Sequence, residues 1–128
     1  MITQKDLKRF RFMKIEAEDL RMRLNELEAN FTSPLIPSYM EGSKTSLESD
    51  LMGFRVHKLD ELRSRYKNKL NLIVLEQEKI EKWMESLGER ERLMIRLIYF
   101  DSMTWENTAE RLNISVVTIF NWHKKLFS

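Results

Sequence analysis

Eight residues near the C-terminal end carry the side chains best suited to contacting another molecule. They are Ser115, Val116, Val117, Thr118, Phe120, Asn121, Lys124 and Lys125. An asparagine amide can form a bidentate pair with adenine, and valines can contact thymine methyl groups. The hydroxyl and ammonium groups are candidates for phosphate contacts. These residue types predict binding to the major groove of double-stranded DNA.

These side chains are predicted to lie on the second helix of a helix-turn-helix motif over residues 104–126. Thr104 and Ser115 take N-cap positions, where a side-chain oxygen accepts a hydrogen bond from a free backbone amide. Asn113 falls in the turn, where a left-handed backbone is needed, and Ala109 supplies the small side chain required where two helices cross closely. The residues predicted to face inward are Ile114, Ile119, Trp122 and Leu126. An ordinary bundle of two packed helices is the alternative, but it requires neither this turn nor this alanine.

The first 31 residues predict a long amphipathic helix. Between residues 3 and 31, apolar side chains recur at alternating steps of three and four, at Phe10, Met13, Ala17, Leu20, Leu24, Leu27 and Phe31. The charged residues between them, Arg11 and Lys14 included, are expected on the solvent-exposed face. Pro34 and Pro37 then end the helix, because proline lacks an amide donor and restricts the residue before it.

A second and longer helix is predicted from about residue 47 to residue 86. Apolar residues recur there at every seventh position, at Met52, Leu59, Tyr66, Ile73, Ile80 and Leu87. Such a helix, about 60 Å long, needs a partner, and the first helix supplies one in an antiparallel hairpin with a loop at about residues 32–46. Because the apolar positions extend beyond what the first helix covers, we expect a homodimer or a higher homo-oligomer.

Gly88 marks the predicted end of the long helix, and residues 89–100 predict a short helix with a broad apolar stripe. The expected fold class is therefore all-α. An N-terminal antiparallel helical hairpin, similar to a coiled coil, precedes a C-terminal helix-turn-helix domain. We place the boundary so that residues 1–86 form an oligomerisation region and residues 87–128 form the DNA-binding domain.

Positive charge is sparse in the predicted motif. The chain has a net charge of +2, and residues 102–128 contain three positive residues and two negative ones. A specific DNA-binding protein usually neutralises several phosphates, so other cations must contribute. Arg90, Arg92 and Arg96 precede the motif, and residues 55–69 contain six Lys or Arg and two acidic residues. For the stretch 55–69, contact with DNA and an ordinary solvated helix face both stay open.

The last third of the chain resembles the promoter-reading C-terminal domain of bacterial sigma factors. The resemblance rests on residues 89–93 (Glu-Arg-Glu-Arg-Leu), residues 104–106 (Thr-Trp-Glu) and the pair Ile114-Ser115. With a charged helical hairpin in front, the chain is also similar to small sigma-like regulators of phages and prophages, including the ArpU-like late-gene regulators. This resemblance implies a DNA-reading domain of three or four helices and a role in the transcription of phage genes.

The composition argues against several other classes of function. The chain has no cysteine, which excludes disulfides, thiolate catalysis and cysteine-based zinc sites. His57 and His123 lie far apart without a carboxylate cluster, so no metal site is expected, and His123 is assigned to a phosphate contact or an ordinary end-of-helix position. No Ser-His-Asp arrangement or phosphate-binding glycine loop is found, so we expect neither an enzyme nor a cofactor. Without a signal peptide or a membrane-spanning segment, the protein is expected in the host bacterial cytoplasm.

Three functions stay open at this level. The first is a DNA-binding transcriptional regulator of phage or prophage type that reads the major groove with residues 115–126. The second is a non-enzymatic adaptor that docks on RNA polymerase or another regulator, which the apolar Val116, Val117 and Phe120 favour. The third is a phage DNA-packaging subunit, because such proteins also join helix-turn-helix units to helical oligomerisation segments.

Overall fold

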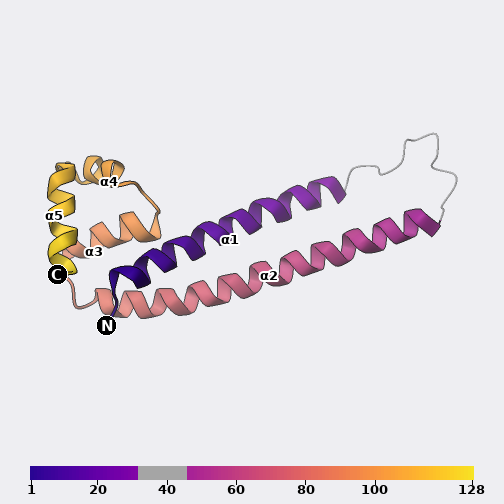
Figure 1. The fold of residues 1–128 in the computed structure, drawn as a ribbon, viewed down its shortest axis with the longest axis horizontal. Helices are drawn as coiled ribbons and strands as arrows, with labels where there is room; N and C mark the ends of the chain where they lie inside the picture. Colours follow the sequence, from indigo (N-terminus) through magenta and orange to yellow (C-terminus); the bar gives the residue numbers. More distant parts are fainter. Residues whose placement is uncertain (32–45) are drawn as a thin grey trace. The chain divides into compact units, whose positions relative to one another are not determined.

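A computed structural model of the protein describes residues 1–31 and 46–128, and this part of the chain contains helices and no strand. In chain order the elements are α1 (Gln4–Phe31), α2 (Ser46–Met84), α3 (Glu89–Ile95), the π-helix η2 (Arg96–Phe100), α4 (Trp105–Leu112) and α5 (Val116–Leu126) (Figure 1). The predicted all-α fold is confirmed. Residues 32–45 of the predicted loop, with both prolines, lie outside the described residues, as does the side chain of Phe31.

The chain divides into two compact units, and both long helices contribute to each of them. Residues 16–71 form one unit, which we call the hairpin unit. Residues 1–15 and 72–128 form the other, which we call the helix-turn-helix unit. This structural division does not coincide with the functional boundary predicted between residues 86 and 87, and the assignment of an oligomerisation region stays a prediction.

In the hairpin unit, the two long helices run antiparallel. Lys69 forms an ion pair with Glu16 (Nζ to Oε2, 2.7 Å), and Arg63 forms one with Glu28 (Nη2 to Oε1, 3.1 Å). The later residue of α1, Glu28, thus pairs with the earlier residue of α2, Arg63, as expected for antiparallel helices. Lys69 is 25% exposed and the other three side chains are 43–64% exposed, and surface pairs of this kind contribute about 0–1 kcal/mol. They fix the alignment of the helices more than the stability of the unit.

Several of the predicted apolar positions on the long helices are buried. Phe10 and Ala17 from α1 and Leu59, Ile73 and Ile80 from α2 are buried, whereas Met52 is exposed. Of these buried residues, Ala17 and Leu59 belong to the hairpin unit, and the other three belong to the helix-turn-helix unit. The periodicity predicts the buried face of both helices, but it does not predict how far the packing extends.

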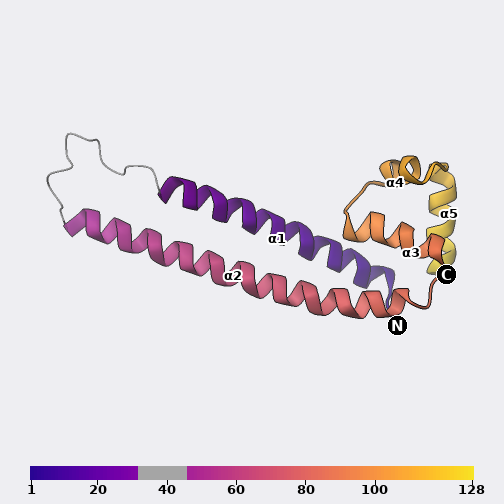
Figure 2. The same ribbon diagram turned by 180° about the vertical axis from the view of Figure 1, so that it is seen from behind.

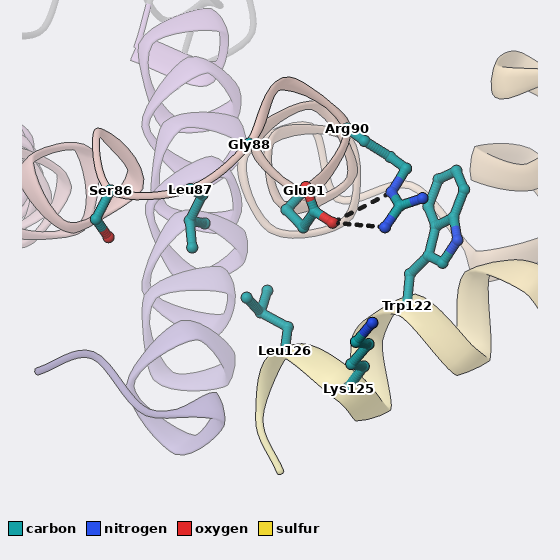
Figure 3. Close-up of a pocket in the computed structure, with 8 residues that line it drawn as sticks. All are labelled: Ser86, Leu87, Gly88, Arg90, Glu91, Trp122, Lys125 and Leu126. Atoms are coloured by element: carbon teal, nitrogen blue, oxygen red, sulfur yellow. Dashed lines mark hydrogen bonds and ion pairs between the residues drawn. The ribbon is translucent and has the colours of Figure 1, made fainter.

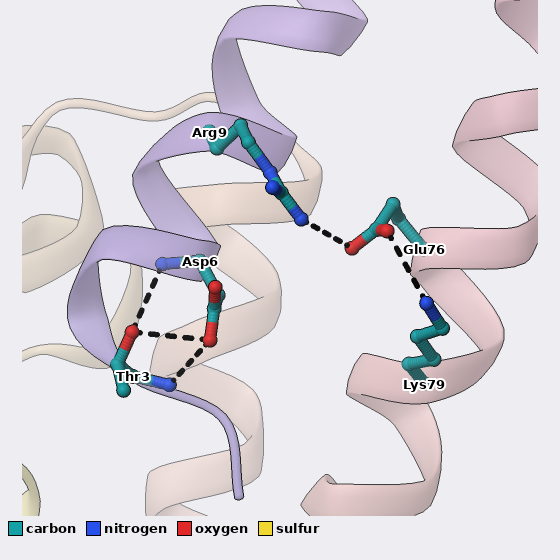
Figure 4. A network of polar contacts seen from close by, with 5 residues as sticks. All are labelled: Thr3, Asp6, Arg9, Glu76 and Lys79. Atoms are coloured by element: carbon teal, nitrogen blue, oxygen red, sulfur yellow. Dashed lines mark hydrogen bonds and ion pairs between the residues drawn. The ribbon is translucent and has the colours of Figure 1, made fainter.

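Helix α1 begins with a capping arrangement that the sequence analysis did not identify. The backbone amide of Thr3 donates to Asp6 Oδ2 (2.9 Å), and the amide of Asp6 donates to Thr3 Oγ1 (3.2 Å), so two free amides are satisfied reciprocally. The Asp6 carboxyl also accepts from the Thr3 hydroxyl (3.0 Å), and the two bonds it accepts, from the amide and then from the hydroxyl of Thr3, lower its pKa. One turn later, Arg9 pairs with Glu76 of α2 (3.1 Å), which also contacts Lys79 (Figure 4). The spacing of Thr3 and Asp6 is the signal that predicts such a cap.

The first turns of α1 belong to the core of the helix-turn-helix unit. The ring of Phe10 is fully buried and lies 5.1 Å from the ring of Phe100 at a tilted angle. Lys14 donates to the carbonyl of Phe100, and Arg11 Nη2 donates to the carbonyl of Ser102 at 3.5 Å. The prediction that these two cations lie only on a solvated face was wrong, because carbonyls freed at the end of η2 need donors.

The short helix predicted over residues 89–100 is present, but its last five residues form a π-helix. The amide of Asp101 donates to the carbonyl of Arg96 at 2.9 Å, a bond across five residues. Four apolar residues of this segment, Leu97, Ile98, Tyr99 and Phe100, are all buried. Helix α2 ends at Met84, before the predicted end, and Gly88 is the N-cap residue of α3, in an extended conformation with φ −70°. Within residues 1–31 and 46–128, no helix is both long enough and apolar enough to cross a membrane.

Candidate nucleic-acid interface

The turn between α4 and α5 has the geometry that its sequence predicts. Thr104 Oγ1 accepts from the amide of Asn107 at 3.1 Å, and Ser115 Oγ accepts from the amide of Thr118 at 3.1 Å. Asn113 adopts φ 57° and ψ 45°, the left-handed conformation. Thr104 therefore caps the start of α4, the left-handed backbone of Asn113 ends α4, and Ser115 caps the start of α5. All three predictions are confirmed.

Beneath this turn, α5 packs against α4 and α3 (Figures 1 and 2). Ala109 and Ile119 are buried, as predicted, and Ile114 is half-buried, with its amide donating to the carbonyl of Ala109 at 3.0 Å. Trp122 and Leu126 are half-buried and do not reach the interior. The core of the motif is therefore centred on Ile119.

The outward side of α5 carries the predicted contact residues. Val116, Val117 and Phe120 are 40%, 67% and 54% exposed. Ser115, Asn121, Lys124 and Lys125 are exposed as well, and Thr118 is half-buried. The structure thus brings the eight predicted residues together on one short helix and its cap. Their contact with DNA stays a prediction.

Two of the eight residues are already engaged within the helix start. The hydroxyls of Ser115 and Thr118 lie 2.7 Å apart, and Ser115 Oγ also accepts the capping bond. Phe120 lies partly against α4, with its ring centroid 6.1 Å from that of Trp105. The side chains that extend freely from the first turn of α5 are therefore the two valines.

The C-terminal part of α5 borders a hollow that the sequence did not predict. The guanidinium of Arg90 stacks over the ring of Trp122 at 4.3 Å and pairs with Glu91 at 2.9 Å (Figure 3). Hydrogen bonds from the backbone amide of Glu91 and from Arg90 hold the pKa of the Glu91 carboxyl below its usual value, and the charge of Lys125 adds to this effect. These residues line a hollow of about 360 Å³. Arg90 is thereby held beside α5, with the Glu91 carboxylate as its ion-pair partner.

His123 has a different place from the one predicted. It is buried, and its Nε2 lies 2.7 Å from the hydroxyl of Tyr99. Its ring is also close to the rings of Trp105 (4.8 Å) and Phe127 (4.9 Å). The predicted phosphate contact was therefore wrong, because the imidazole is enclosed by aromatic side chains. No periodic signal distinguishes His123 from Trp122 as the inward residue, since both lie one turn after Ile119.

The burial of His123 makes the stability of this unit depend on pH. Burial, aided by the charge of Lys8, lowers the pKa of His123 from 6.5. The unfolded chain therefore takes up a proton at a higher pH than the folded chain. The contribution of neutral His123 to the free energy of unfolding is fully present above pH 6.5 and decreases as the pH falls below that value. We expect the free energy of unfolding, measured by urea titration between pH 7.5 and 5.5, to decrease toward the acid end.

The pH prediction has a matched control in the other histidine. His57 is exposed on α2, so His57→Gln should keep the pH dependence, whereas His123→Gln should flatten it even if it lowers stability at every pH. The same pH dependence in both variants would contradict the assignment to His123.

The basic stretch of residues 55–69 is largely occupied by contacts within the hairpin unit. Five of its six cations contact a carboxylate or a carbonyl oxygen: Arg55, Lys58, Arg63, Arg65 and Lys69. Arg65, for example, lies 2.8 Å from Glu61. These pairings favour the interpretation of a solvated helix face, and contact of this stretch with DNA stays untested.

Comparison with known proteins agrees with the geometry of this unit. Residues 77–125 match the family model described as Sigma-70, region 4. Region 4 of sigma-70 factors is a DNA-binding helix-turn-helix domain. The predicted resemblance to sigma factors is therefore confirmed for residues 77–125. No curated protein and no solved structure matches the chain.

Proposed function

We propose that the protein is a DNA-binding transcriptional regulator that inserts α5 into the major groove. The observation that carries this proposal is the exposed outer side of α5 on a region 4-type helix-turn-helix domain. In such motifs the N-terminal residues of the second helix lie against the base edges. Asn121 is then placed to pair with adenine, and Lys124 and Lys125 to contact phosphates.

The regulator is proposed to be of phage or prophage type and to act in the host bacterial cytoplasm. The support is the resemblance to ArpU-like regulators, which combine a charged helical hairpin with a sigma-like C-terminal domain. Along the chain, the long helices α1 and α2 come before the helix-turn-helix pair α4 and α5. DNA is the partner on this proposal, and RNA polymerase is a further partner that sigma-like domains suggest.

A homodimer is proposed to hold two copies of α5 on one DNA site. Leu72 and Leu75 lie one turn apart on α2 and are 53% and 56% exposed, although apolar residues of this size gain about 1.5–3 kcal/mol from full burial. A second copy of the chain would cover them. Two subunits would also double the few cations available for phosphates, and they would bind a roughly palindromic site.

Sedimentation of the chain tests the dimer. The unmodified protein should sediment as a dimer, at twice its monomer mass of 15.5 kDa, and the double variant Leu72→Glu/Leu75→Glu should sediment as a monomer. Leu93→Glu is the matched control, because Leu93 is similarly exposed on α3, and it should leave the dimer intact. A monomer at high concentration for the unmodified chain would contradict the proposal.

A protein-interaction adaptor is the second candidate function, and one observation favours it. Val116, Val117 and Phe120 give α5 an apolar outer side, whereas recognition helices usually present polar side chains to DNA. An adaptor would place this surface against RNA polymerase or another regulator. A phage DNA-packaging subunit remains a weaker third candidate, supported only by the order of a helical segment and a helix-turn-helix unit.

Selection from a pool of random DNA duplexes separates these functions. The full chain is incubated with the pool at fixed salt, and retained duplexes are recovered and sequenced over several rounds. We expect enrichment of a specific sequence, with affinity that falls steeply as salt increases. If no duplex is retained at low salt and RNA polymerase co-purifies with the chain, the adaptor function is favoured over the DNA-binding regulator.

A further inference from the structure

We infer that α5 selects thymine-containing sites through apolar contacts between Val116, Val117 and the thymine methyl groups. This inference rests on the proposed DNA binding and goes further, because it names the base that is recognised and the chemical group that is read. The starting observation is that Val117 is two-thirds exposed in the first turn of α5, with Val116 beside it. Such a surface gains free energy only when an apolar group covers it.

The chemistry of the major groove leaves few groups that could cover these valines. Its base edges carry hydrogen-bonding groups and one apolar group, the C5 methyl of thymine. Between Ser115 and His123, α5 and its cap contain no Lys, Arg, Asp or Glu. The helix therefore lacks, over its base-reading part, the bidentate Arg or Lys that recognises guanine and the carboxylate that accepts from cytosine. Thymine, by its methyl group, and adenine, by Asn121, are the bases that this surface fits.

The hydroxyl groups of the first turn do not offer an equally free alternative. Ser115 Oγ accepts from the amide of Thr118 and lies 2.7 Å from the Thr118 hydroxyl. Both hydroxyls are thus oriented by the cap of the helix. The valines lie between these two residues in sequence and extend outward, at the end of the helix that approaches the base edges most closely.

The size of the effect follows from the burial of single methyl groups. Covering one methyl is comparable to burying one methylene, and its loss weakens binding on the order of fourfold. Two contacted thymines would therefore contribute on the order of fifteenfold to affinity. This effect is independent of salt, because a methyl group changes neither the phosphates nor the hydrogen-bonding groups of the base.

Replacement of thymine by uracil in the selected duplex isolates this contact. Uracil differs from thymine by the C5 methyl only, so duplexes with and without the methyl groups are compared by fluorescence anisotropy with the full chain at one salt concentration. We expect uracil at the central positions of the site to weaken binding by about fourfold per methyl. Uracil placed outside the site should leave the affinity unchanged.

Variants of the two valines test whether their side chains contact the thymine methyl groups. Val116→Ala and Val117→Ala should each reduce the ratio between the thymine and uracil affinities toward one. Both positions are exposed, so the helical circular dichroism signal should not change. Lys124→Ala is the control: it should weaken binding to both duplexes equally and leave the ratio as it is.

The outcomes distinguish this inference from the proposed function. Three results would overturn the inference while DNA binding itself stands. They are a selected site without thymine, equal affinity for the thymine and uracil duplexes, and a loss of affinity on uracil replacement that persists in both valine variants. Retention of no duplex by the unmodified chain would overturn both. A penalty that is lost in the valine variants and kept in Lys124→Ala supports the thymine contact.

Discussion

Replacing Phe10 by alanine should lower the free energy of unfolding of the helix-turn-helix unit by about 3–5 kcal/mol. The ring of Phe10 is fully buried and contacts the ring of Phe100 at the end of η2. Its removal leaves a cavity at the centre of a small core, and such cores relax only partly. The expected effect is large because residues 1–15 are part of this unit, although more than 50 residues separate them from the rest of it in sequence.

The measurement is denaturant unfolding followed by tryptophan fluorescence. The three tryptophans, Trp83, Trp105 and Trp122, all belong to the helix-turn-helix unit, so their emission reports on this unit. Phe12→Ala is the matched control: Phe12 is on the same helix and 63% exposed, and surface substitutions usually change stability by less than about 0.5 kcal/mol. Equal and small effects of both variants would show that α1 does not stabilise this unit.

Replacing Asn121 by alanine should weaken binding to the selected DNA site by roughly 5- to 150-fold. This range corresponds to the 1–3 kcal/mol by which a bidentate side-chain-to-base pair discriminates against a wrong base. Asn121 is exposed on the outer side of α5, and on the proposed function it pairs with the edge of adenine. The loss should be confined to one base pair, so a duplex altered at that position should bind the unmodified chain and the variant about equally.

Lys124→Ala should behave differently, because a phosphate contact carries no sequence information. It should weaken binding to all duplexes alike and reduce the slope of log affinity against log salt by about one. Asn107→Ala is the control for both variants, since Asn107 is an exposed residue of α4, the other helix of the motif. Unchanged affinity in Asn121→Ala and Lys124→Ala would remove α5 from its role as recognition helix.

Local chemistry made the motif predictable from the sequence. The cap of Ser115, the left-handed Asn113 and the small Ala109 each depend on near neighbours along the chain, and all three have the expected geometry. The fold class and the buried faces of the long helices follow in the same way from periodic apolar residues. These features depend on residues within a few helical turns of one another, so they can be predicted from a single sequence.

The parts that were missed depend on residues distant in sequence. Arg11 and Lys14 appear as surface cations by their periodicity, but carbonyls about 90 residues later require their donors. His123 is buried among the rings of Tyr99, Trp105 and Phe127, which come from other parts of the chain or from the end of α5. Arg90 stacks on Trp122 across two helices. Polar contacts of this kind arise from tertiary packing, which sequence periodicity does not specify.

The most direct test of the central claim is residue-resolved NMR of the full chain with the selected duplex. If α5 reads the major groove, the largest changes in amide and methyl chemical shifts should fall within residues 115–125, including the methyl groups of Val116 and Val117. Residues 16–71 of the hairpin unit should change little. Shift changes concentrated in residues 16–71, with α5 unchanged, would contradict the assignment of α5 as the helix that binds DNA.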